Sequence, residues 1–349
     1  MSNYQKHIIP HSTTIREALV LLNGLDDSLM ILFITDVSGI MRGTITDGDI
    51  RRALINGISV DSPVESVMFR DFRSIREGNF NLELFHKYKS QGINLLPVLD
   101  KVGCIIGIRN LANLKSMLPV DVVIMAGGEG QRLRPLTEKT PKPLLVVGSK
   151  PILEHNIDRL IKFGVQHIHI TLRYLGEQIA DYFGDGSSKG IHISYVYENQ
   201  ILGTFGAVGL VEELKNENVL VMNSDLLTNI DYEDFYRSFV DTRADMLIAA
   251  VPYQVNIPYA VLETTNGKVE RFVEKPTYTY HSNAGIYMIR RDYLMLIDGK
   301  EKLDATDFMQ QLIESNKNVQ TYPLLQYWLD IGKHDDFEKA QETIKHLAL

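Results

Sequence analysis

The feature that most constrains the fold is a glycine-rich segment directly after a short apolar run. Val122 to Met125 are apolar, and Gly127, Gly128 and Gly130 follow them. The run predicts a buried strand, and the glycines leave backbone N–H groups bare enough to contact phosphate oxygens. The spacing matches neither the G-x-x-x-x-G-K-[ST] loop nor the G-x-G-x-x-G dinucleotide fingerprint, so ATPase and dehydrogenase functions lose their main support. The segment therefore predicts a nucleotide-binding loop of another kind.

A longer motif continues from this loop. From Gly127 the chain reads G-G-x-G-x-R-L-x-P-L-T, and Pro-Lys-Pro follows with Lys142 at its centre. The pattern resembles the signature of the sugar-1-phosphate nucleotidyltransferases, the enzymes that make nucleotide sugars. One departure is Gln131, because many members of that family have Thr or Ser at this place.

The resemblance implies a role for each part of the motif. The glycine N–H groups and the side chain of Arg132 would hold the β- and γ-phosphates of a nucleoside triphosphate, and Lys142 would hold the α-phosphate. Arg132 and Lys142 are thus candidate catalytic residues. The candidate nucleotide-binding residues of the loop are Ala126, Gly127, Gly128 and Gly130.

The composition narrows the classes of protein. The 349 residues are 44% hydrophobic, which suits two globular domains, and the formal net charge is -8. Such a chain lacks the excess of Lys and Arg that nucleic-acid binding needs. The sequence shows no membrane-spanning apolar run and no secretion signal, and the single cysteine, Cys104, excludes an internal disulfide. We therefore expect a cytoplasmic protein that binds neither nucleic acid nor a membrane.

The first part of the chain contains an internal repeat. A constant offset of 64 aligns Asp36 with Asp100 and pairs glycines in the same turn. Each copy predicts a helix, an apolar strand, a turn, a second strand and a closing helix. The segment ITDVSGIMRGTITDGDIRRAL resembles the cystathionine-β-synthase (CBS) domain. Residues 1–118 therefore resemble an α+β tandem CBS pair, with copies at about 1–62 and 63–118.

Two residues of the first copy are candidate ligand-binding residues. The CBS motif G-x-x-[ST]-x-x-D is matched by Gly43, Thr46 and Asp49. In that family the pair is a regulatory module whose cleft often binds an adenine nucleotide, with a carboxylate on the ribose hydroxyls and a hydroxyl on phosphate. The alternative is that Thr46 only caps a helix and Asp49 is a first-turn residue, and both interpretations stay open. The second copy departs from the motif, with Asn110 and Asn113 at these places.

Residues 119–349 predict an α/β domain that begins after Leu118-Pro119. Strands and helices alternate from Val122 to Val251, a pattern typical of a Rossmann-like, mainly parallel sheet with helices on both faces. The alternation then breaks, because Asn266-Gly267 between two strand-like segments is a strong hairpin signal. We therefore expect a mixed sheet with ligands at the carboxyl ends of its strands.

Two aspartates follow apolar strands in further motifs of the nucleotidyltransferases. Asp225 ends Asn-Ser-Asp, and Asp330 lies in Trp-Leu-Asp-Ile-Gly, which match the family's N-x-D and W-x-D-x-G elements. Alone, each aspartate is typical of a turn or a helix cap. The resemblance implies that together they bind Mg²⁺, which accepts one or two carboxylates. Mg²⁺ is therefore the expected cofactor, and Asp225 is also a candidate catalytic residue.

Other segments match the sugar-binding motifs of the same family. Glu274-Lys275-Pro276 matches E-K-P, in which the lysine, a candidate catalytic residue, holds the sugar phosphate and the glutamate binds sugar hydroxyls. Asn283 lies in the match to N-x-G-[IV]-Y and would also face the sugar.

The segment from Glu198 to Ala207 resembles the family's E-x-x-x-L-G-T-A-G-A, which implies that Glu198 and Gly203 bind the nucleotide. Phe205 replaces the usual small residue, so we expect the fit around the sugar or base to differ. Guanine offers adjacent N–H donors that suit a carboxylate, whereas uracil and thymine suit an amide. Glu198 therefore favours GTP, and dTTP, UTP and CTP stay alternatives.

The resemblance leaves the sugar open. A CBS pair before this domain resembles guanylyltransferases of bacterial surface-sugar and nonulosonate synthesis, which favours glucosamine 1-phosphate; mannose, heptose and glucose 1-phosphates are alternatives. A non-catalytic nucleotide-sugar sensor is a further alternative, although a sensor is expected to lose one of Arg132, Lys142, Asp225, Lys275 or Asp330, all present here. Because CBS pairs commonly associate, the resemblance also implies a homo-oligomer.

Overall fold

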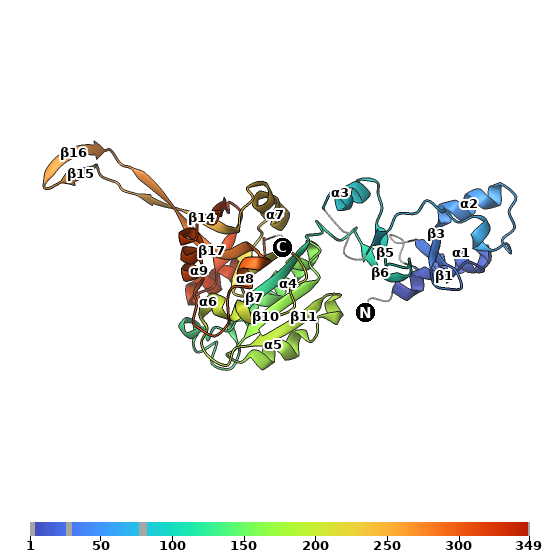
Figure 1. Cartoon of the computed structure of the whole chain (residues 1–349), viewed down its shortest axis with the longest axis horizontal. Coiled ribbons are helices and arrows are strands. Elements are labelled where there is room, and N and C mark those ends of the chain that lie inside the picture. Colours follow the sequence, from blue (N-terminus) through green and yellow to red (C-terminus); the bar gives the residue numbers. More distant parts are fainter. Residues whose placement is uncertain (1–3, 26–29, 77–81, 348–349) are drawn as a thin grey trace. The chain divides into compact units, whose positions relative to one another are not determined.

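The computed structural model describes residues 4–25, 30–76 and 82–347. The chain divides into unit 1, which holds Met1–Pro119 with Lys162–Gly164, and unit 2, which holds Val120–Ile161 with Val165–Leu349 (Figure 1). Within the described ranges, every helix is too short or too polar to cross a membrane.

Unit 1 contains two small sheets with the same strand order. In each, the first strand runs parallel to the second, which pairs antiparallel with the third. The elements are β1 (Ile8–Pro10), α1 (Ile15–Asn23), β2 (Ile31–Thr35), β3 (Met41–Thr46), α2 (Asp47–Ile55), β4 (Ile75–Arg76), α3 (Leu82–Ser90), β5 (Leu95–Leu99) and β6 (Ile105–Asn110).

The two sheets repeat each other in detail. The register of β2 and β3 shifts between Ile34 and Thr35, and that of β5 and β6 shifts 64 residues later, between Val98 and Leu99. The turns also correspond, because Asp36 and Asp100 each accept hydrogen bonds from backbone N–H groups two and four residues further on. The offset seen in the sequence is therefore an offset of structure.

The closing helix expected in both copies forms only in the first. There α2 starts with a capping box, in which Thr46 Oγ1 accepts from Asp49 N–H at 3.3 Å and Asp49 Oδ2 accepts from Thr46 N–H at 2.9 Å. In the second copy β6 is followed by turns, and Asn110 Oδ1 accepts from Ala112 N–H at 3.0 Å. The prediction of a second closing helix was wrong because Asn110 and Asn113 replace the two capping residues.

Unit 2 is built on a seven-stranded sheet with the order β11-β10-β7-β12-β17-β14-β18. The first four of these strands are parallel, β17 is antiparallel to both of its neighbours, and β14 is parallel to β18. The sheet is thus mixed and mainly parallel, as expected. Its strands are β7 (Val120–Ala126), β10 (His167–Leu172), β11 (His192–Tyr197), β12 (Asn218–Asn223), β14 (Met246–Asn256), β17 (Thr277–Arg290) and β18 (Val319–Pro323).

Helices separate the sheet strands of unit 2 as far as β14, as predicted, and short strands not predicted from the sequence lie between them. They are β8 (Val146–Val147), β9 (Lys150–Pro151), α4 (Ile152–Lys162), α5 (Gly176–Phe183), α6 (Gly203–Gly206), β13 (Leu226–Thr228), α7 (Tyr232–Asp241), β15 (Val261–Thr265), β16 (Lys268–Val273), α8 (Arg291–Leu294), α9 (Ala305–Glu314), β19 (Trp328–Asp330) and α10 (His334–Thr343).

Strands β14 and β17 continue beyond the sheet and lead to the β15–β16 hairpin (Figure 1). Asn266 and Gly267, which join β15 to β16, have φ angles of 50° and 81°, so the predicted two-residue turn is confirmed. We call residues 251–282, which include this hairpin, the arm.

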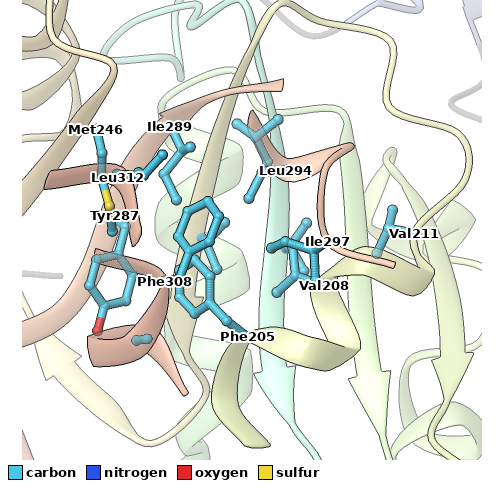
Figure 2. Close-up of a cluster of buried hydrophobic side chains, with 14 of the residues drawn as sticks. Phe205, Val208, Val211, Met246, Tyr287, Ile289, Leu294, Ile297, Phe308 and Leu312 are labelled. Carbon is cyan, nitrogen blue, oxygen red and sulfur yellow. The ribbon is translucent and has the colours of Figure 1, made fainter. Parts of the chain in front are cut away.

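A buried cluster around Phe205 packs beside the sheet (Figure 2). The Phe205 ring meets Tyr287 edge-on at 5.2 Å between centroids and stacks on Phe308 at 5.3 Å. Phe205 is fully buried and belongs to the core. Its ring points into the core, where an aromatic side chain buries a large apolar area, and Phe205 is not among the residues that line the cleft. A changed fit around the sugar or base stays a prediction.

Candidate active site

A cleft of about 570 Å³ opens at the carboxyl edge of the central sheet. The parallel strands β7, β10, β11 and β12 bring their carboxyl ends to this edge, so residues that follow them face one space. The cleft is lined by these residues among those predicted from the sequence: Ala126, Gly127, Gly128, Gly130, Arg132, Lys142, Glu198, Gly203 and Asp225.

Two glycines of the loop lie close against neighbouring side chains. A Cβ atom at Gly127 would overlap the Glu198 carboxylate, and one at Gly130 would lie 3.1 Å from Lys142 Cβ. Gly130 also has a φ of 60°, in the left-handed region that favours glycine. The bare backbone of the loop therefore comes directly against Glu198 and Lys142.

Glu198 follows β11, and its carboxylate faces the glycine loop. Leu202 N–H donates to Oε2 at 3.4 Å. Burial raises the pKa of Glu198, while the Leu202 hydrogen bond and the nearby Arg173 guanidinium act in the opposite direction. Such a carboxylate can accept hydrogen bonds from a base that presents adjacent N–H donors.

The structure adds Arg173 and Glu129 to the cleft region, neither of which was predicted from the sequence. Arg173 directly follows β10 and lines the cleft. Its guanidinium donates to Glu129 Oε1 at 3.4 Å, and Gln131 donates to Glu129 Oε2 at 2.8 Å. These hydrogen bonds, the one from Gln131 first, hold the pKa of Glu129 below its usual range. Gln131, the departure from the family motif, therefore positions a carboxylate inside the loop.

The two aspartates predicted to bind metal lie side by side. β13 pairs antiparallel with β19, and Ile331 N–H donates to the backbone oxygen of Asp225 at 3.1 Å. Lys142 is buried between the two side chains, because its Nζ donates to Asp225 Oδ2 and lies 3.9 Å from Asp330 Oδ1. A short strand pair thus brings Asp225 and Asp330 together, and Lys142 offsets their charge.

The donor atoms of this pair fit Mg²⁺. Asp225 Oδ1 and Asp330 Oδ1 are buried, and neither has a hydrogen-bond partner within the part of the chain that the structure describes. Burial and the charge of Asp225 raise the pKa of Asp330, against the influence of Lys142 and Arg132. Over residues 4–25, 30–76 and 82–347 there is no cluster of three potential metal ligands. Two carboxylates suit Mg²⁺ because phosphate oxygens and water complete its octahedral shell.

Arg132 connects the glycine loop to the motif of Asp330. A Cβ atom at Gly332 would lie 3.3 Å from Arg132 Nη2, so the guanidinium packs over the backbone just after Asp330. The absence of a side chain at Gly332 therefore makes room for the loop arginine at the edge of the cleft.

A second pair of residues missed by the sequence analysis lies across the cleft. Lys302 and Asp304 both line it, and Lys302 Nζ is 3.1 Å from Asp304 Oδ2. Asp304 Oδ1 also accepts from Thr204 N–H at 3.1 Å. Gly203, with φ of 74°, packs against the same carboxylate, since a Cβ there would lie 2.7 Å from Oδ1. No local motif marks these residues, and only the fold brings them to the Gly203 turn.

The predicted sugar-binding residues are placed differently. Glu274 and Lys275 lie on the arm, outside the cleft lining, and their charged atoms are 4.0 Å apart with both side chains mostly exposed. Asn283 lies at the base of the arm, where its Nδ2 donates to Tyr287 Oη at 2.8 Å. The structure therefore assembles the nucleotide and metal residues in one place but does not bring Glu274 and Lys275 to them.

Comparison with known proteins identifies the family. The family described as "Nucleotidyl transferase" matches residues 121–346. A mannose-1-phosphate guanylyltransferase of Mycobacterium tuberculosis is 34% identical over 236 residues, 64% of each chain. A D-glycero-alpha-D-manno-heptose 1-phosphate guanylyltransferase of Aneurinibacillus thermoaerophilus is 30% identical over 235 residues, 65% of this chain and 99% of the relative.

A solved structure shows the same fold. HddC from Yersinia pseudotuberculosis is 28% identical with a TM-score of 0.52, covering 64% of this chain and 99% of HddC. It has also been solved in complex with GMP-PN, with a TM-score of 0.50. The chain spans 64% of the length of the mycobacterial relative. Since the match covers most of unit 2 and includes the whole cleft, this chain belongs to the nucleotidyl transferase family, with sugar-1-phosphate guanylyltransferases among its relatives.

Proposed function

We propose that the chain transfers a guanylyl group from GTP to a sugar 1-phosphate and releases pyrophosphate. The observation that carries the proposal is the meeting of Lys142, Asp225 and Asp330 at the edge of a glycine-rich loop. Two polyanions must come together in this reaction, so a site needs cations, bare N–H donors and a place for a divalent ion. The cleft offers all of these groups.

The reaction needs no nucleophile from the protein. An oxygen of the sugar phosphate, already ionised at neutral pH, attacks the α-phosphorus, and the bond from this phosphorus to the β-phosphate oxygen breaks. Positioning and charge neutralisation then provide the rate enhancement. Arg132 and the N–H groups of the glycine loop would hold the departing pyrophosphate, and Lys142 would neutralise charge on the α-phosphate. Mg²⁺ held by Asp225 and Asp330 would supply further charge neutralisation at the reacting phosphates.

Glu198 supports guanine as the base. Its carboxylate lies against Gly127 at the phosphate loop, and an ionised carboxylate can accept from both N1–H and N2–H₂ of guanine. The relatives named above are guanylyltransferases, and one of the solved structures holds GMP-PN. Base selection by Glu198 is thus a proposal with support from geometry and from relatives.

The sugar is proposed as a hexose or heptose 1-phosphate. The names of the relatives give mannose 1-phosphate and a heptose 1-phosphate as their substrates. Glucosamine 1-phosphate, favoured by the sequence, is the third candidate, and glucose 1-phosphate is the fourth.

Pyrophosphate release tests the proposal. The full-length protein with Mg²⁺ is given GTP, ATP, CTP, UTP or dTTP with each of the four sugar phosphates. We expect release with GTP and one sugar, and removal of Mg²⁺ by chelation should abolish it. Preference for a nucleotide other than GTP would overturn the role of Glu198, and silence across the grid would favour the sensor alternative.

For unit 1 we propose a tandem CBS module, supported by its repeated sheets. The geometry of Thr46 and Asp49 bears on its ligand, because Asp49 Oδ1 accepts from Arg52 at 2.6 Å while Oδ2 is engaged in the capping box. A ribose would have to replace these hydrogen bonds. Titration calorimetry with AMP and ATP tests binding, and Asp49→Asn should abolish the heat if the carboxylate holds ribose.

A further inference from the structure

Three residues stand in one row just beyond the central sheet, at the edge of the cleft. The last paired residues of β7, β10 and β11 lie opposite one another in the register, and they are Ala126, Leu172 and Tyr197. The next residues along these strands are Gly127, Arg173 and Glu198. Glu198 N–H donates to Leu172 O at 2.9 Å, so the alignment continues past the paired region. Arg173 therefore follows the middle strand, between the phosphate loop and the proposed base-selecting carboxylate.

The chain fixes the backbone around Arg173. Leu172, just before it, pairs on both sides within the sheet. Tyr174, just after it, donates from its hydroxyl to Thr137 O at 3.1 Å. The Arg173 side chain is 26% exposed and lines the cleft. A side chain carried on a fixed backbone is preorganised for a ligand, which lowers the cost of binding.

The Arg173 guanidinium has more donors than the chain uses. Its Nη2 donates to Glu129 Oε1 at 3.4 Å, and this is the one hydrogen bond of the guanidinium within the described part of the chain. A guanidinium carries five N–H donors in a planar fork. Glu129 therefore orients the fork without occupying all of its donors, and the others are available to a ligand in the cleft.

The side chains of Arg173 and Glu198 both come up against Gly127. A Cβ atom at Gly127 would overlap Glu198 Oε1 and would lie 3.4 Å from Arg173 Cβ. Burial raises the pKa of Glu198, and the positive charge of Arg173 acts against this influence. A carboxylate and a guanidinium thus stand side by side in the lining of the cleft.

Guanine has an edge that complements such a pair. Along this edge it presents the donors N2–H₂ and N1–H, and then the acceptors O6 and N7. A carboxylate accepts from the two donors, and a guanidinium donates to the two acceptors. Adenine carries an amino group in place of O6 and has no hydrogen on N1, so it fits neither group. An adjacent carboxylate and guanidinium can therefore bind guanine and reject adenine.

An apolar side chain completes this part of the cleft. Ile201 comes three residues after Glu198, lines the cleft and is 63% exposed. Ligand pockets combine apolar side chains with a few polar groups that fix orientation. Ile201 can therefore cover the flat face of a purine whose edge is held by the two charged groups.

We infer that Arg173 is a second base-selecting residue: its guanidinium donates to O6 and N7 of the guanine whose N1–H and N2–H₂ donate to Glu198. The inference rests on the proposed use of GTP, and it names the residue that rejects ATP. Bidentate contact of arginine with guanine O6 and N7 is the commonest specific contact between proteins and base edges.

The surroundings of Arg173 disfavour the alternative role of a phosphate ligand. A phosphate that approached the guanidinium would also approach the Glu129 carboxylate, which Arg173 contacts at 3.4 Å and Gln131 at 2.8 Å. Like charges repel strongly at such distances. A neutral base meets no such repulsion, so the pair of Arg173 and Glu129 suits a base better than a phosphate.

Two nucleotide analogues test the inference. In 7-deaza-GTP a C–H group replaces N7, and ITP lacks the N2 amino group of guanine. Calorimetry with Mg²⁺ and without a sugar phosphate gives the Kd of each analogue and of GTP. We expect the wild type to bind 7-deaza-GTP about 5- to 10-fold more weakly than GTP, and Arg173→Met to bind the two equally. The penalty for ITP should persist in Arg173→Met and shrink in Glu198→Gln.

Three further variants separate the fork from its charge and its partner. Arg173→Lys keeps the charge but not the fork, so it should also lose the discrimination against 7-deaza-GTP. Glu129→Gln should keep the discrimination, because the amide oxygen can still accept from Arg173. The matched control is Arg237→Met, an arginine of α7 that is paired with Glu233 at 2.7 Å and lies outside the cleft lining. It should leave all three affinities unchanged.

The outcomes distinguish this inference from the proposed function. Equal affinity of the wild type for GTP and 7-deaza-GTP, or full discrimination in Arg173→Met or Arg173→Lys, would overturn the inference. The same loss of affinity for UTP as for GTP in Arg173→Met would also overturn it, because it would indicate a phosphate contact. The expected binding pattern without pyrophosphate release from any sugar phosphate would leave the inference standing and would instead be a failure of the proposed reaction.

Discussion

The cleft and the arm both carry motifs of the nucleotidyltransferases, but in opposite surroundings. In the cleft, Lys142 is buried and paired with Asp225. On the arm, Lys275 is exposed and its nearest acidic group is its neighbour Glu274, 4.0 Å away. Lys142 is held by residues at the edge of the central sheet. Lys275 lies on a two-stranded ribbon whose apolar face is exposed.

The difference shows that the edge of a parallel sheet fixes the positions of site residues. Strands that end together bring their following residues together, so the positions of Glu198, Arg173 and Asp225 follow from strand pairing. No such constraint acts at the far end of the arm.

Asp225→Asn should lower pyrophosphate release by about 100- to 1,000-fold, because it removes a charge from the proposed metal site. The fold should survive, because the buried Lys142 still has a carboxylate partner: its Nζ lies 3.9 Å from Asp330 Oδ1. The matched control is Asp335→Asn, whose side chain is 87% exposed on α10 and which should leave the rate unchanged. A rate near that of the wild type for Asp225→Asn would remove this residue from the catalytic site.

Truncating aromatic rings compares the two regions by stability. Phe205→Ala should destabilise unit 2 by about 3–5 kcal/mol, because it leaves a cavity beside Tyr287 and Phe308. Tyr253→Ala on the exposed arm should change stability by no more than about 0.5 kcal/mol. Urea unfolding followed by circular dichroism measures both, and equal losses would show that the arm is packed within its own chain.

Glu198→Gln should reduce the preference for GTP over UTP and dTTP by about 10-fold, since an amide cannot accept from two adjacent donors with one oxygen as two carboxylate oxygens can. The ratio of kcat/KM values for the three nucleotides measures the effect. Glu177→Gln, on α5, serves as a control outside the cleft lining. An unchanged ratio would assign base selection to another group.

The smallest effect is a pH dependence of GTP binding. Burial raises the pKa of Glu198, so its ionised form is lost at a higher pH than that of an exposed glutamate. The KM for GTP should therefore climb as pH falls below neutrality in the wild type, beginning at a higher pH than an exposed glutamate would cause, and stay flatter in Glu198→Gln. Folding stability should rise as pH falls while the affinity for GTP declines, because the cost of burying the ionised carboxylate disappears as pH falls through the raised pKa. Parallel KM curves for the two proteins would contradict the assignment.

Much of unit 2 could be predicted because its patterns are local. The Asn266-Gly267 turn needs only two residues with positive φ, and the strand positions follow from short apolar runs. Arg173 follows an apolar strand just as Asp225 does, so the same rule could have found it. Lys302 and Asp304 could not be found this way, because tertiary packing alone brings them to Gly203.

The missed features have physical reasons too. Alternating apolar and polar residues indicate that a strand has one buried face, but they do not show what covers that face. The sequence therefore did not reveal that β14 continues beyond the sheet after Val251. The second copy of the repeat kept its strands but lost its closing helix, because propensity without a cap did not suffice at Asn110. The burial of the Phe205 ring could not be predicted, because a motif position does not show which way its side chain points.

Trp328 gives the protein an intrinsic fluorescence probe near the candidate metal site. It is the single tryptophan of the chain, it lies two residues before Asp330, and its indole N–H donates to Ala284 O at 2.9 Å at the base of the arm. Indole-selective excitation therefore reports on one spot between the acidic pair and the ribbon. Emission from the unlabelled protein should respond to titration with a divalent ion.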